Sequence, residues 1–580
     1  MDFAIFANQT ILLDMKRILL FLCVLYFALP IKIQSQNTYP KNYFQSPIDF
    51  RILLSGTFGE LRSDHFHTGI DIKTRGTEGA SVFAAADAYV SRIKISAFGY
   101  GNSIYLNHPN GFVTVYGHLS KLDAKLAAYV KKQQYSRKSF EVDLYLDKDQ
   151  FIYKKGELIA LSGNSGGSGG PHLHFEIRDG KTQEPINPLL FGIEVKDFIR
   201  PVIQSLRVYP IGKIPFNLEI GGWGENHYLK TGDTIIIPNN FYLGILTVDK
   251  QNDTQNSNGV YEVELFLDSL KIYGNRQELL DFTTGKYINT FIDYEYYSNH
   301  NKRYQRTYIS PNNQLKIYND VRNNGLIRLI EKKVYELCYV VKDANGNSSK
   351  LKFYVKSGNS ATIKDLPIDT LKKAMLYAGR EHFFVNDNVK LNLPANALYD
   401  SLNFHFQVLP AIKESYTPVY QIHRPDIPLH RAASLSIRVE NIPDNLKEKM
   451  IIASVADKKF NTVNTKWEGQ WASASIVVFG KYTIIADTVK PEIVLISPIK
   501  NAKLDAKSVI SIKIKDELSG IKSYNGYLND EWVVFEYDAK NNMVYHFIEP
   551  DRLKVENNLR FEVIDNVGNK NILERKLLKL

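Results

Sequence analysis

The chain has very little cysteine. Its 580 residues contain only two cysteines, and one of them, Cys23, lies in an apolar stretch near the start. Cys338 therefore stands alone in the rest of the chain, which cannot form an intramolecular disulfide once that stretch is removed. This excludes a disulfide-stapled scaffold, so an exported protein of this composition must depend on large hydrophobic cores or on bound metal.

Long hydrophobic runs and a strong charge of one sign are also lacking. Beyond residue 36 no segment is apolar enough to cross a bilayer, so we expect no stable membrane span after that point. The net charge of +10 comes from 72 basic and 62 acidic residues, which are spread along the chain. Such a balance favours contact with an anionic surface, but without a basic stripe it does not predict a nucleic-acid partner.

The first 36 residues have the order of a secretory signal. Lys16 and Arg17 precede an apolar run that ends near Leu29, and small polar residues follow. The run is short for a membrane helix, although an uncleaved N-terminal anchor is the alternative. We therefore interpret residues 1–36 as a signal peptide and expect an exported protein, located in the periplasm, the cell envelope or outside the cell.

The composition favours β-structure. Aromatic residues make up 12% of the chain, with 35 Tyr and 31 Phe, and hydrophobic residues make up 44%. Flat and half-buried side chains fit a pleated sheet, and short alternating segments bounded by Gly, Asn or Pro recur throughout the chain. The length suggests about four domains. We predict a mostly β protein whose antiparallel β-sheet core is followed by several β-sandwich domains.

Two short motifs are repeated far apart in the chain. DFIRPVI, which starts at Asp197, shares Asp, Pro and Ile at identical spacing with DTVKPEI, which starts at Asp487. VKDANGN around Asp343 shares Asp, Gly and Asn with VIDNVGN around Asp565. Each pair of motifs brackets one stretch of alternating segments. A proline-containing entry and a late Asp/Asn/Gly hairpin are natural in antiparallel sandwiches.

These repeats set the expected domain boundaries. We predict a first domain over 37–192, an Ig-like β-sandwich over 193–358, a further β-rich domain over 359–486 and a second Ig-like β-sandwich over 487–580. Within the first domain, Lys121 to Gln134 has apolar residues at helical spacing. We interpret residues 121–150 as a helical and charged insertion on the β-core.

Histidines concentrate in the first domain, where six of the thirteen lie between His65 and His174. In GGPHLHFEIRDG, a strand would place His172, His174 and Glu176 on one face, with the apolar residues on the other. The glycine-rich stretch Gly163–Gly170 before them would let a substrate backbone approach closely, since no side chains block the groove. His108 is predicted to be a residue of a hairpin turn rather than a ligand.

A second segment supplies further ligands. In HFHTGIDI, His67 and Asp71 are four residues apart, which places both on one face of an extended segment. Together with one histidine of the downstream pair they form two imidazoles and a carboxylate, which leaves one tetrahedral position for water, as catalytic zinc requires. His118, at the end of an alternating segment, and the remaining histidine are then available for proton transfer.

Three motifs follow one another in this domain: HFHTGIDI, YGHLSKL and GPHLHFEIRDG. In these motifs and their order, the chain resembles the lysostaphin-type (LytM-like) zinc endopeptidases, which cut peptides of bacterial peptidoglycan. The resemblance extends over about Phe58 to Pro188. The resemblance implies that His67, Asp71 and His174 bind one zinc ion per chain and that His118 and His172 are the catalytic pair. It also implies an exported zinc metalloendopeptidase that acts on peptidoglycan stem peptides or crosslinks.

Two alternatives to this function remain open. The first is a non-catalytic adhesion or scaffold protein that keeps the zinc fold as a binding groove. The second is a metallopeptidase that acts on a surface or exported protein. The large C-terminal β domains leave room for a protein partner in either case. Among neighbouring residues, His65 is interpreted as flanking, and Glu176 either as a support of a ligand histidine or as a structural carboxylate.

Overall fold

The fold is described from a computed structural model, which covers residues 39–358, 363–366, 374–440, 442, 445–456, 459–497, 503–505 and 507–579. The predicted signal peptide, residues 1–36, lies outside the described residues. Residues from Lys41 onward form one unit, which is described by itself. We refer to its parts in chain order as the first (41–192), second (193–358), third (374–486) and fourth (487–579) regions.

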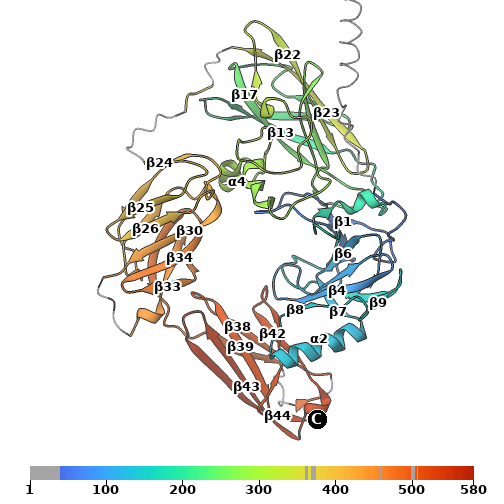
Figure 1. The fold of residues 1–580 in the computed structure, drawn as a ribbon, viewed down its shortest axis with the longest axis vertical. Coiled ribbons are helices and arrows are strands. Elements are labelled where there is room, and N and C mark those ends of the chain that lie inside the picture. Colours follow the sequence, from blue (N-terminus) through green and yellow to red (C-terminus); the bar gives the residue numbers. More distant parts are fainter. Residues whose placement is uncertain are drawn as a thin grey trace, which may run out of the picture. The chain divides into compact units, whose positions relative to one another are not determined.

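The first region is built on a large antiparallel sheet, and a small sheet packs beside it (Figure 1). In order across the large sheet the strands are β1 (Leu54–Gly56), β2 (Ile70–Lys73), β11 (His172–Asp179), β6 (Phe112–Gly117), β5 (Ser103–Asn107), β4 (Ala88–Ile95) and β8 (Val142–Tyr145), with β12 (Pro185–Ile186) on β11 and β9 (Ile152–Tyr153) on β4. The small sheet holds β3 (Ser81–Phe83), β10 (Leu158–Ser162) and β7 (Leu119–Leu122).

Local sequence explains the main elements of this region. The apolar face of β11 buries Leu173, Phe175 and Ile177 completely, as the alternation predicts. Helix α2 (Ala124–Arg137) lies beside β7 and β8, begins at the N-cap Asp123 and confirms the helix expected in the insertion (Figure 1).

The second region is dominated by another large sheet. Its strands are β19 (Leu270–Arg276), β18 (Glu262–Leu267), β22 (Val334–Lys342), β23 (Ser348–Ser357), β15 (Asn226–Leu229), β14 (Phe216–Trp223), β13 (Val202–Pro210), β17 (Asn240–Val248) and β20 (Gln305–Arg306), with β16 (Thr234–Ile237) on β23 and β21 (Ile327–Arg328) on β17. Short helices η2 (Gly285–Tyr287), α3 (Ile288–Phe291), α4 (Tyr294–His300) and η3 (Asn323–Gly325) interrupt it.

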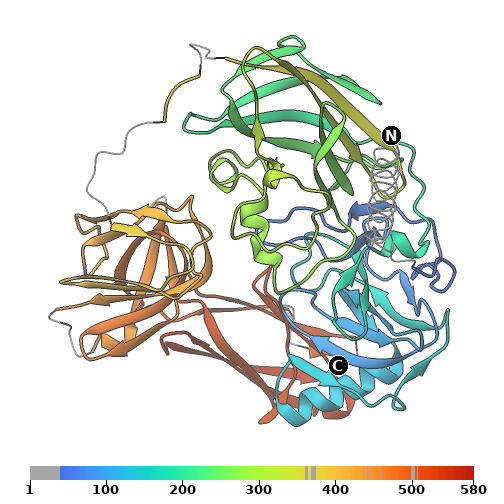
Figure 2. The same cartoon turned by 45° about the horizontal axis from the view of Figure 1, so that its top comes forward.

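The third and fourth regions, drawn in orange and red in Figure 2, are each built mainly from two sheets. Each region contains a large cluster of buried hydrophobic side chains. In the third region one sheet contains, in order, β25 (His382–Asn386), β26 (Val389–Leu393), β30 (Pro428–Arg438), β34 (Trp471–Val478) and β33 (Thr465–Glu468). The other contains β28 (Phe406–Leu409), β29 (Val419–Ile422), β35 (Gly480–Ala486), β31 (Met450–Ala456) and β32 (Lys459–Val463). In addition, β24 (Ala374–Leu376) pairs with β27 (Leu402–Phe404). In the fourth region one sheet contains, in order, β36 (Glu492–Ser497), β38 (Val509–Lys515), β42 (Met543–Phe547) and β41 (Glu536–Asp538). The other contains β37 (Lys503–Leu504), β44 (Lys570–Lys579), β43 (Glu556–Asp565), β39 (Ile521–Leu528) and β40 (Glu531–Val533).

The mostly β fold class is confirmed, since a β-sheet core is followed by several further sheets. The Ig-like character and the domain boundaries stay predictions. A separate core cluster joins side chains of three regions, among them Phe66, Phe291 and Tyr399. No helix within the described residues is long and apolar enough to cross a membrane.

Candidate metal centre

Two neighbouring elements bring His67 and Asp71 together. Asp71 lies in β2, and His67 comes three residues before that strand begins. The ring of His67 is fixed because its Nδ1 lies 2.8 Å from the carbonyl oxygen of Thr57. A carbonyl only accepts hydrogen bonds, so Nδ1 carries the proton. The lone pair of neutral His67 is therefore on Nε2, which lies 3.0 Å from Asp71 Oδ1.

His174 reaches the same place from the neighbouring strand. β11 pairs with β2 in a register that sets His174 directly opposite Asp71. The Nε2 of His174 lies 2.8 Å from Glu176 Oε1, which holds the ring in one orientation. Since a carboxylate accepts, Nε2 donates, and the lone pair of the neutral ring is on Nδ1.

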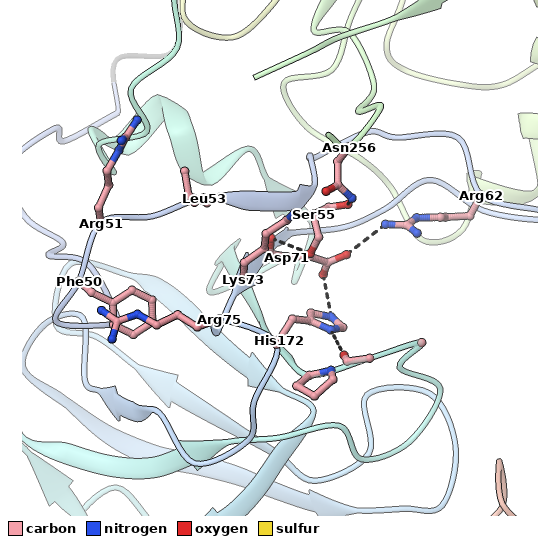
Figure 3. Close-up of a pocket in the computed structure, with 14 residues that line it drawn as sticks. Phe50, Arg51, Leu53, Ser55, Arg62, Asp71, Lys73, Arg75, His172 and Asn256 are labelled. Atoms are coloured by element: carbon pink, nitrogen blue, oxygen red, sulfur yellow. Dashed lines mark hydrogen bonds and ion pairs between the residues drawn. The ribbon is translucent and has the colours of Figure 1, made fainter. Parts of the chain in front are cut away.

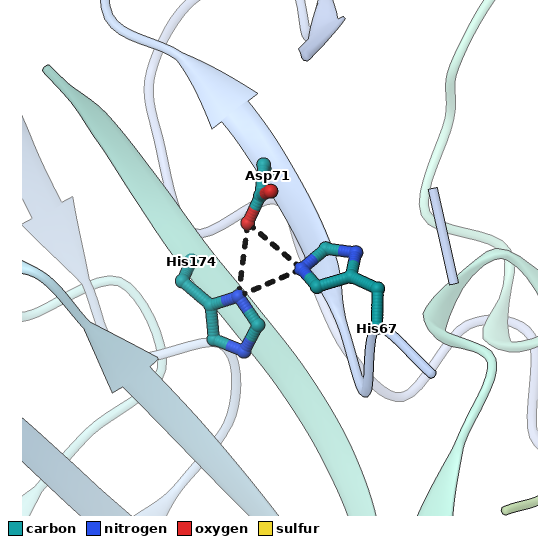
Figure 4. A group of neighbouring side chains, drawn as sticks. All are labelled: His67, Asp71 and His174. Carbon is teal, nitrogen blue, oxygen red and sulfur yellow. Dashed lines mark hydrogen bonds and ion pairs between the residues drawn. The ribbon is translucent and has the colours of Figure 1, made fainter. Parts of the chain in front are cut away.

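Three donor atoms therefore converge (Figure 4). His174 Nδ1 lies 2.9 Å from Asp71 Oδ1 and 3.1 Å from His67 Nε2. All three residues are buried. Two imidazole nitrogens with one carboxylate oxygen, each ring held through its other nitrogen, fit a transition-metal ion such as zinc and leave a coordination position open. The structure thus brings together the three residues predicted to bind the metal.

The charges around the donors favour an ionised carboxylate. Although burial raises the pKa of Asp71, the His67, His172 and His174 rings outweigh it and hold that pKa well below its usual range. Burial lowers the pKa of His174, but hydrogen bonds to Asp71 and Glu176 raise it to about 9. The strongly negative surroundings of His174 are those that a cation would occupy favourably.

The two remaining histidines lie beside this group. His118 follows β6 with φ of +59°, a left-handed conformation that is uncommon outside glycine. Its ring centroid is 4.7 Å from that of His172. The Nδ1 of His118 donates to the Ser165 carbonyl at 2.8 Å, and the Nδ1 of His172 donates to the Gly170 carbonyl at 2.8 Å.

Both tautomers therefore present Nε2 as the reactive nitrogen. His172 Nε2 lies 3.3 Å from Asp71 Oδ1, at the edge of the converging donors. Burial, together with the nearby His174 and His172 rings, lowers the pKa of His118 to about 3. His118 is accordingly neutral at neutral pH, with its lone pair on Nε2. The structure brings both predicted catalytic residues to the centre.

A buried network supports the ring of His174. Arg178 Nε donates to Glu176 Oε2 at 2.5 Å, and the Tyr100 hydroxyl donates to Glu176 Oε1 at 2.6 Å. Thr68 also donates to Glu176 Oε1, at 2.5 Å. Burial would raise the pKa of Glu176, but Arg178 and His174 hold it far below its usual range. Glu176 therefore stays ionised and orients His174.

Two pockets meet at the converging donors. One, of about 810 Å³, is lined by Phe50, Arg51, Lys73 and Arg75 among others (Figure 3). The other, of about 900 Å³, includes the remaining histidines of the centre. Four residues line both pockets: Arg62, Asp71, Gly169 and His172. The two pockets therefore adjoin at Asp71 and His172, and we call them together the groove.

The second region supplies one wall of the larger pocket. Residues 279–282, 284–286, 303 and 315–317 line it together with the histidines. The 121–150 insertion lines neither of these two pockets. Tyr135 of its helix α2 instead contacts Glu549 and Trp532 of the fourth region.

The glycine-rich stretch has two separate roles. A Cβ on Gly163 would lie 2.4 Å from Ser120 N, and one on Gly166 would lie 2.3 Å from Gly101 N. These two glycines allow close backbone packing rather than access for substrate. Gly169 and Gly170 have open space around them and line the groove. Only this last part of the stretch fits the predicted close approach of a substrate.

His65 lies outside the group of converging donors, as the sequence suggested, whereas two groups that support the donors were not predicted. His65 is exposed and its Nδ1 lies 2.7 Å from Asp64 Oδ1, outside the converging group. Arg62 donates to Asp71 Oδ2 at 3.1 Å. The roles of Tyr100 and of the Thr57 carbonyl were missed, because a tyrosine and a backbone oxygen carry no signal of their own in a single sequence.

Comparison with known proteins relates part of the chain to metallopeptidases. The chain is 31% identical over 166 residues to an uncharacterized metalloprotease of Haemophilus influenzae, covering 27% of this chain and 30% of that protein. More particularly, residues 65–135 match the family model of Peptidase family M23, so the chain carries a domain of that family, of the LytM type, as the motifs predicted. Residues 373–487 match the model of a Zu5-like domain.

Further relatives are named for action on peptidoglycan. The peptidoglycan DD-endopeptidase ShyC of Vibrio cholerae is 30% identical over 149 residues, which cover 25% of this chain and 28% of that protein. The DD-carboxypeptidase/endopeptidase Mpg of Neisseria meningitidis is 33% identical over 129 residues, covering 22% and 23%. The matches span less than a third of each of these relatives.

Solved structures also match part of the chain. A mutant catalytic domain of the prophage-encoded M23 protein EnpA of Enterococcus faecalis is 26% identical, covers 27% of this chain and 98% of that chain, and has a TM-score of 0.19. The catalytic domain of lysostaphin from Staphylococcus simulans is 25% identical, covers 27% of this chain and 95% of that chain, and has a TM-score of 0.17.

Proposed function

We propose that this protein is exported to the cell envelope and that its first region is a zinc-dependent endopeptidase, which hydrolyses peptide bonds in peptidoglycan stem peptides or crosslinks. His67, Asp71 and His174 would hold one zinc ion. The observation that carries the proposal is the convergence of His67 Nε2, Asp71 Oδ1 and His174 Nδ1 within 3.1 Å of one another, beside two further histidines.

The protein side chains supply the proton transfers. A bound zinc ion would act as a Lewis acid on the peptide carbonyl and make a water molecule more acidic. His118 and His172, each fixed through Nδ1, offer Nε2 to take a proton from water, to donate to the developing oxyanion or to protonate the leaving amine. The second-region wall and the glycines of the groove would orient an extended peptide between them.

The charge of the groove supports a carboxylate-bearing peptide. Arg51, Lys73 and Arg75 line the smaller pocket, and Arg62 is shared with the larger one. Peptidoglycan stem peptides carry free carboxylates, for which arginine is a well-matched partner. We favour a crosslink between D-amino acids as the bond cut, in line with the relatives named as DD-endopeptidases.

The test is mass analysis of peptidoglycan fragments released by the full chain. We expect His118→Ala and His172→Ala to lower the release at least about 100-fold while zinc content stays near one per chain. His300→Ala is the matched control, since His300 is an exposed histidine that lines neither pocket, and it should release fragments like the native chain. A chelated sample should release none.

Three results would count against the proposal. Undiminished release by both histidine variants would remove the catalytic pair. A native chain that holds zinc but releases nothing from several peptidoglycan types would favour a binding role instead. Cleavage of surface proteins alone, in a mixture analysed the same way, would favour a protein substrate.

A further inference from the structure

The repeated motifs of the sequence meet in space outside the group of histidines. Asp197 of the first motif and Asp343 of the second lie together with Asp249, with one oxygen of each carboxylate within 4.8 Å of the others. We call these three residues the first aspartate cluster. They are 4%, 3% and 2% exposed respectively, so three acidic side chains are withdrawn from water at one place.

The fourth region contains the equivalent arrangement. Asp487, Asp516 and Asp565 also bring three carboxylate oxygens within 4.8 Å, and we call them the second aspartate cluster. The aspartate that lies outside the repeated motifs has the same position in both regions. Asp249 directly follows β17, which pairs with β13, the first strand after the motif proline of the second region. Asp516 directly follows β38, which pairs with β36, the first strand after the motif proline of the fourth region. The arrangement therefore belongs to the shared topology.

The hairpin aspartates are held alike in both clusters. Asp343 Oδ1 accepts from the backbone N–H of Asn345 and Asn347, and Asp565 Oδ1 accepts from the corresponding N–H groups of Val567 and Asn569. These bonds close the turn and fix where the carboxylates point. By themselves they indicate a structural role, so the distinguishing feature must lie elsewhere.

That feature is a set of buried oxygens without a partner in the first cluster. Among the described residues, Asp197 Oδ2 and Asp249 Oδ1 accept no hydrogen bond. In the second cluster, by contrast, Asp487 accepts at both oxygens, from Val489 N at 3.1 Å and from Ser519 N at 3.0 Å. A buried acceptor with no donor costs free energy comparable to a lost hydrogen bond, more so for a carboxylate.

No basic side chain offsets the negative charge of the first cluster. Within the described part of the chain, none of its three carboxylates forms an ion pair with lysine, arginine or histidine. Burial and the neighbouring Asp343 and Asp197 raise the pKa of Asp249 to about 9. The geometry thus concentrates carboxylate oxygens in a dry place where a cation would relieve both the repulsion and the missing hydrogen bonds.

The chemistry of the donors selects the kind of cation. All three side chains offer oxygen, and Gln251, whose buried Oε1 also lacks a partner among the described residues, lines the same small cavity as Asp249 and Asn345. Oxygen ligands from loops of irregular geometry suit calcium, which takes six to eight of them, better than zinc or the strictly octahedral magnesium ion. We propose that Asp197, Asp249 and Asp343 bind one calcium ion.

The second region thereby carries a metal site that is separate from the histidine centre. The ion would fix the entry to β13, the end of β17 and the hairpin between β22 and β23 in one place. Asp249 also exchanges both backbone hydrogen bonds with Asn258, at 2.9 and 2.8 Å. The ion would therefore also hold the base of the loop between these two residues.

Calcium titration of the full, zinc-loaded chain tests the proposal. Calorimetry in calcium-free buffer, with CaCl₂ as titrant, is expected to show binding that Asp249→Asn weakens at least about 100-fold. Asp516→Asn is the matched control, because it removes the equivalent carboxylate of the second cluster, and it should retain that binding. Thermal unfolding should show a calcium-dependent rise in Tm in the native chain and in Asp516→Asn that Asp249→Asn lacks.

Asp197→Asn provides a second variant in case Asp249→Asn fails to fold, as judged by circular dichroism. It should lose calcium in the same way. The proposal is overturned if the native chain binds no calcium at millimolar concentration, or if both cluster variants bind it like the native chain. Magnesium that raises the Tm as strongly as calcium at equal concentration would also overturn the assignment of the ion.

Discussion

At the scale of single residues, the orientation of His174 depends on Glu176. The carboxylate accepts from His174 Nε2 and is itself held by Arg178 and Tyr100. Carboxylates that hold a ligand histidine in this way fix its tautomer and increase its basicity. The affinity of the centre is therefore set partly by a residue that touches no metal.

Replacing Glu176 by Gln should weaken zinc binding by about 10- to 100-fold, because the amide is a poorer acceptor for His174 Nε2–H. The change also leaves Arg178 without its buried partner, so a loss of stability of a few kcal/mol is expected. Tyr100→Phe is the control: it keeps the acid and its arginine, and should lower zinc affinity much less. Competition with a chromophoric chelator measures both, and equal affinities in the two variants would contradict the role of Glu176.

At the scale of elements, the glycine-rich loop between β10 and β11 separates packing from access. Gly166 has φ of +68° and faces the backbone of Gly101, whereas a Cβ on Gly169 would meet nothing within 4 Å. Gly166→Ala should cost about 1–3 kcal/mol of stability, since alanine is strained there and the neighbouring backbone must move. Gly169→Ala should fold as stably as the native chain. Urea unfolding of both variants measures the two losses of stability. Similar losses would contradict the distinction between a packing glycine and an open one.

The hairpin between β5 and β6 carries a different histidine. His108 is buried, with Nδ1 3.0 Å from the Asp87 carbonyl and Nε2 2.8 Å from Thr114 Oγ1. Burial lowers its pKa from 6.5 to about 4. As the pH falls below about 6.5, the unfolded chain takes up a proton at this histidine while the folded chain does not. The free energy of unfolding therefore decreases by up to about 3 kcal/mol as the pH falls from 6.5 to 4.

His108→Gln should remove this acid sensitivity. The variant is expected to be less stable than the native chain at pH 7, because the buried hydrogen bonds change, yet to lose less stability on going to pH 4. Urea unfolding at several pH values measures the two slopes. Parallel slopes would show that His108 does not titrate as its burial implies.

Elements of this kind are what a single sequence predicts well. The alternation in β11, the turn after His108 and the helical spacing of α2 are local patterns, and each corresponds to the element observed. The two even spacings, at His67 and Asp71 and at His172 and His174, place side chains on one face. The spacing alone did not decide which histidine of the second pair lies with Asp71, because that depends on how β11 pairs with β2.

Contacts between distant segments were not predictable for a physical reason. Residues 279–282 and 284–286 line the groove only because the second region packs against Phe66 and its neighbours, and no local periodicity encodes that packing. Likewise, the repeated aspartates were recognised as motifs, but their convergence with Asp249 depends on strand pairing across the region.

At the scale of the whole molecule, the core cluster around Phe291 couples the second region to the centre. Phe291 is fully buried, and its ring centroid lies 5.6 Å from that of Phe66, the residue before His67. Phe291→Ala should cost about 3–5 kcal/mol of stability and should also weaken zinc binding, because the cavity loosens the segment that bears His67.

Phe535→Ala gives the matched comparison. Phe535 is similarly buried in the core of the fourth region, away from this cluster. Its removal should cost about as much stability but leave zinc affinity unchanged. Thermal unfolding and chelator competition on both variants measure the two effects, and a loss of zinc affinity in both would mean that general destabilisation, rather than the contact with Phe66, is responsible.

One residue joins the first two regions at the centre itself. The Thr57 carbonyl holds His67, while the Thr57 hydroxyl exchanges hydrogen bonds with Gly259 of the second region, at 3.1 Å in each direction. His67, which we propose as a metal ligand, is thus held in part by the second region. Engineers who wish to graft this catalytic segment onto another carrier would have to transplant its neighbour as well, because the graft alone would arrive with one imidazole poorly anchored.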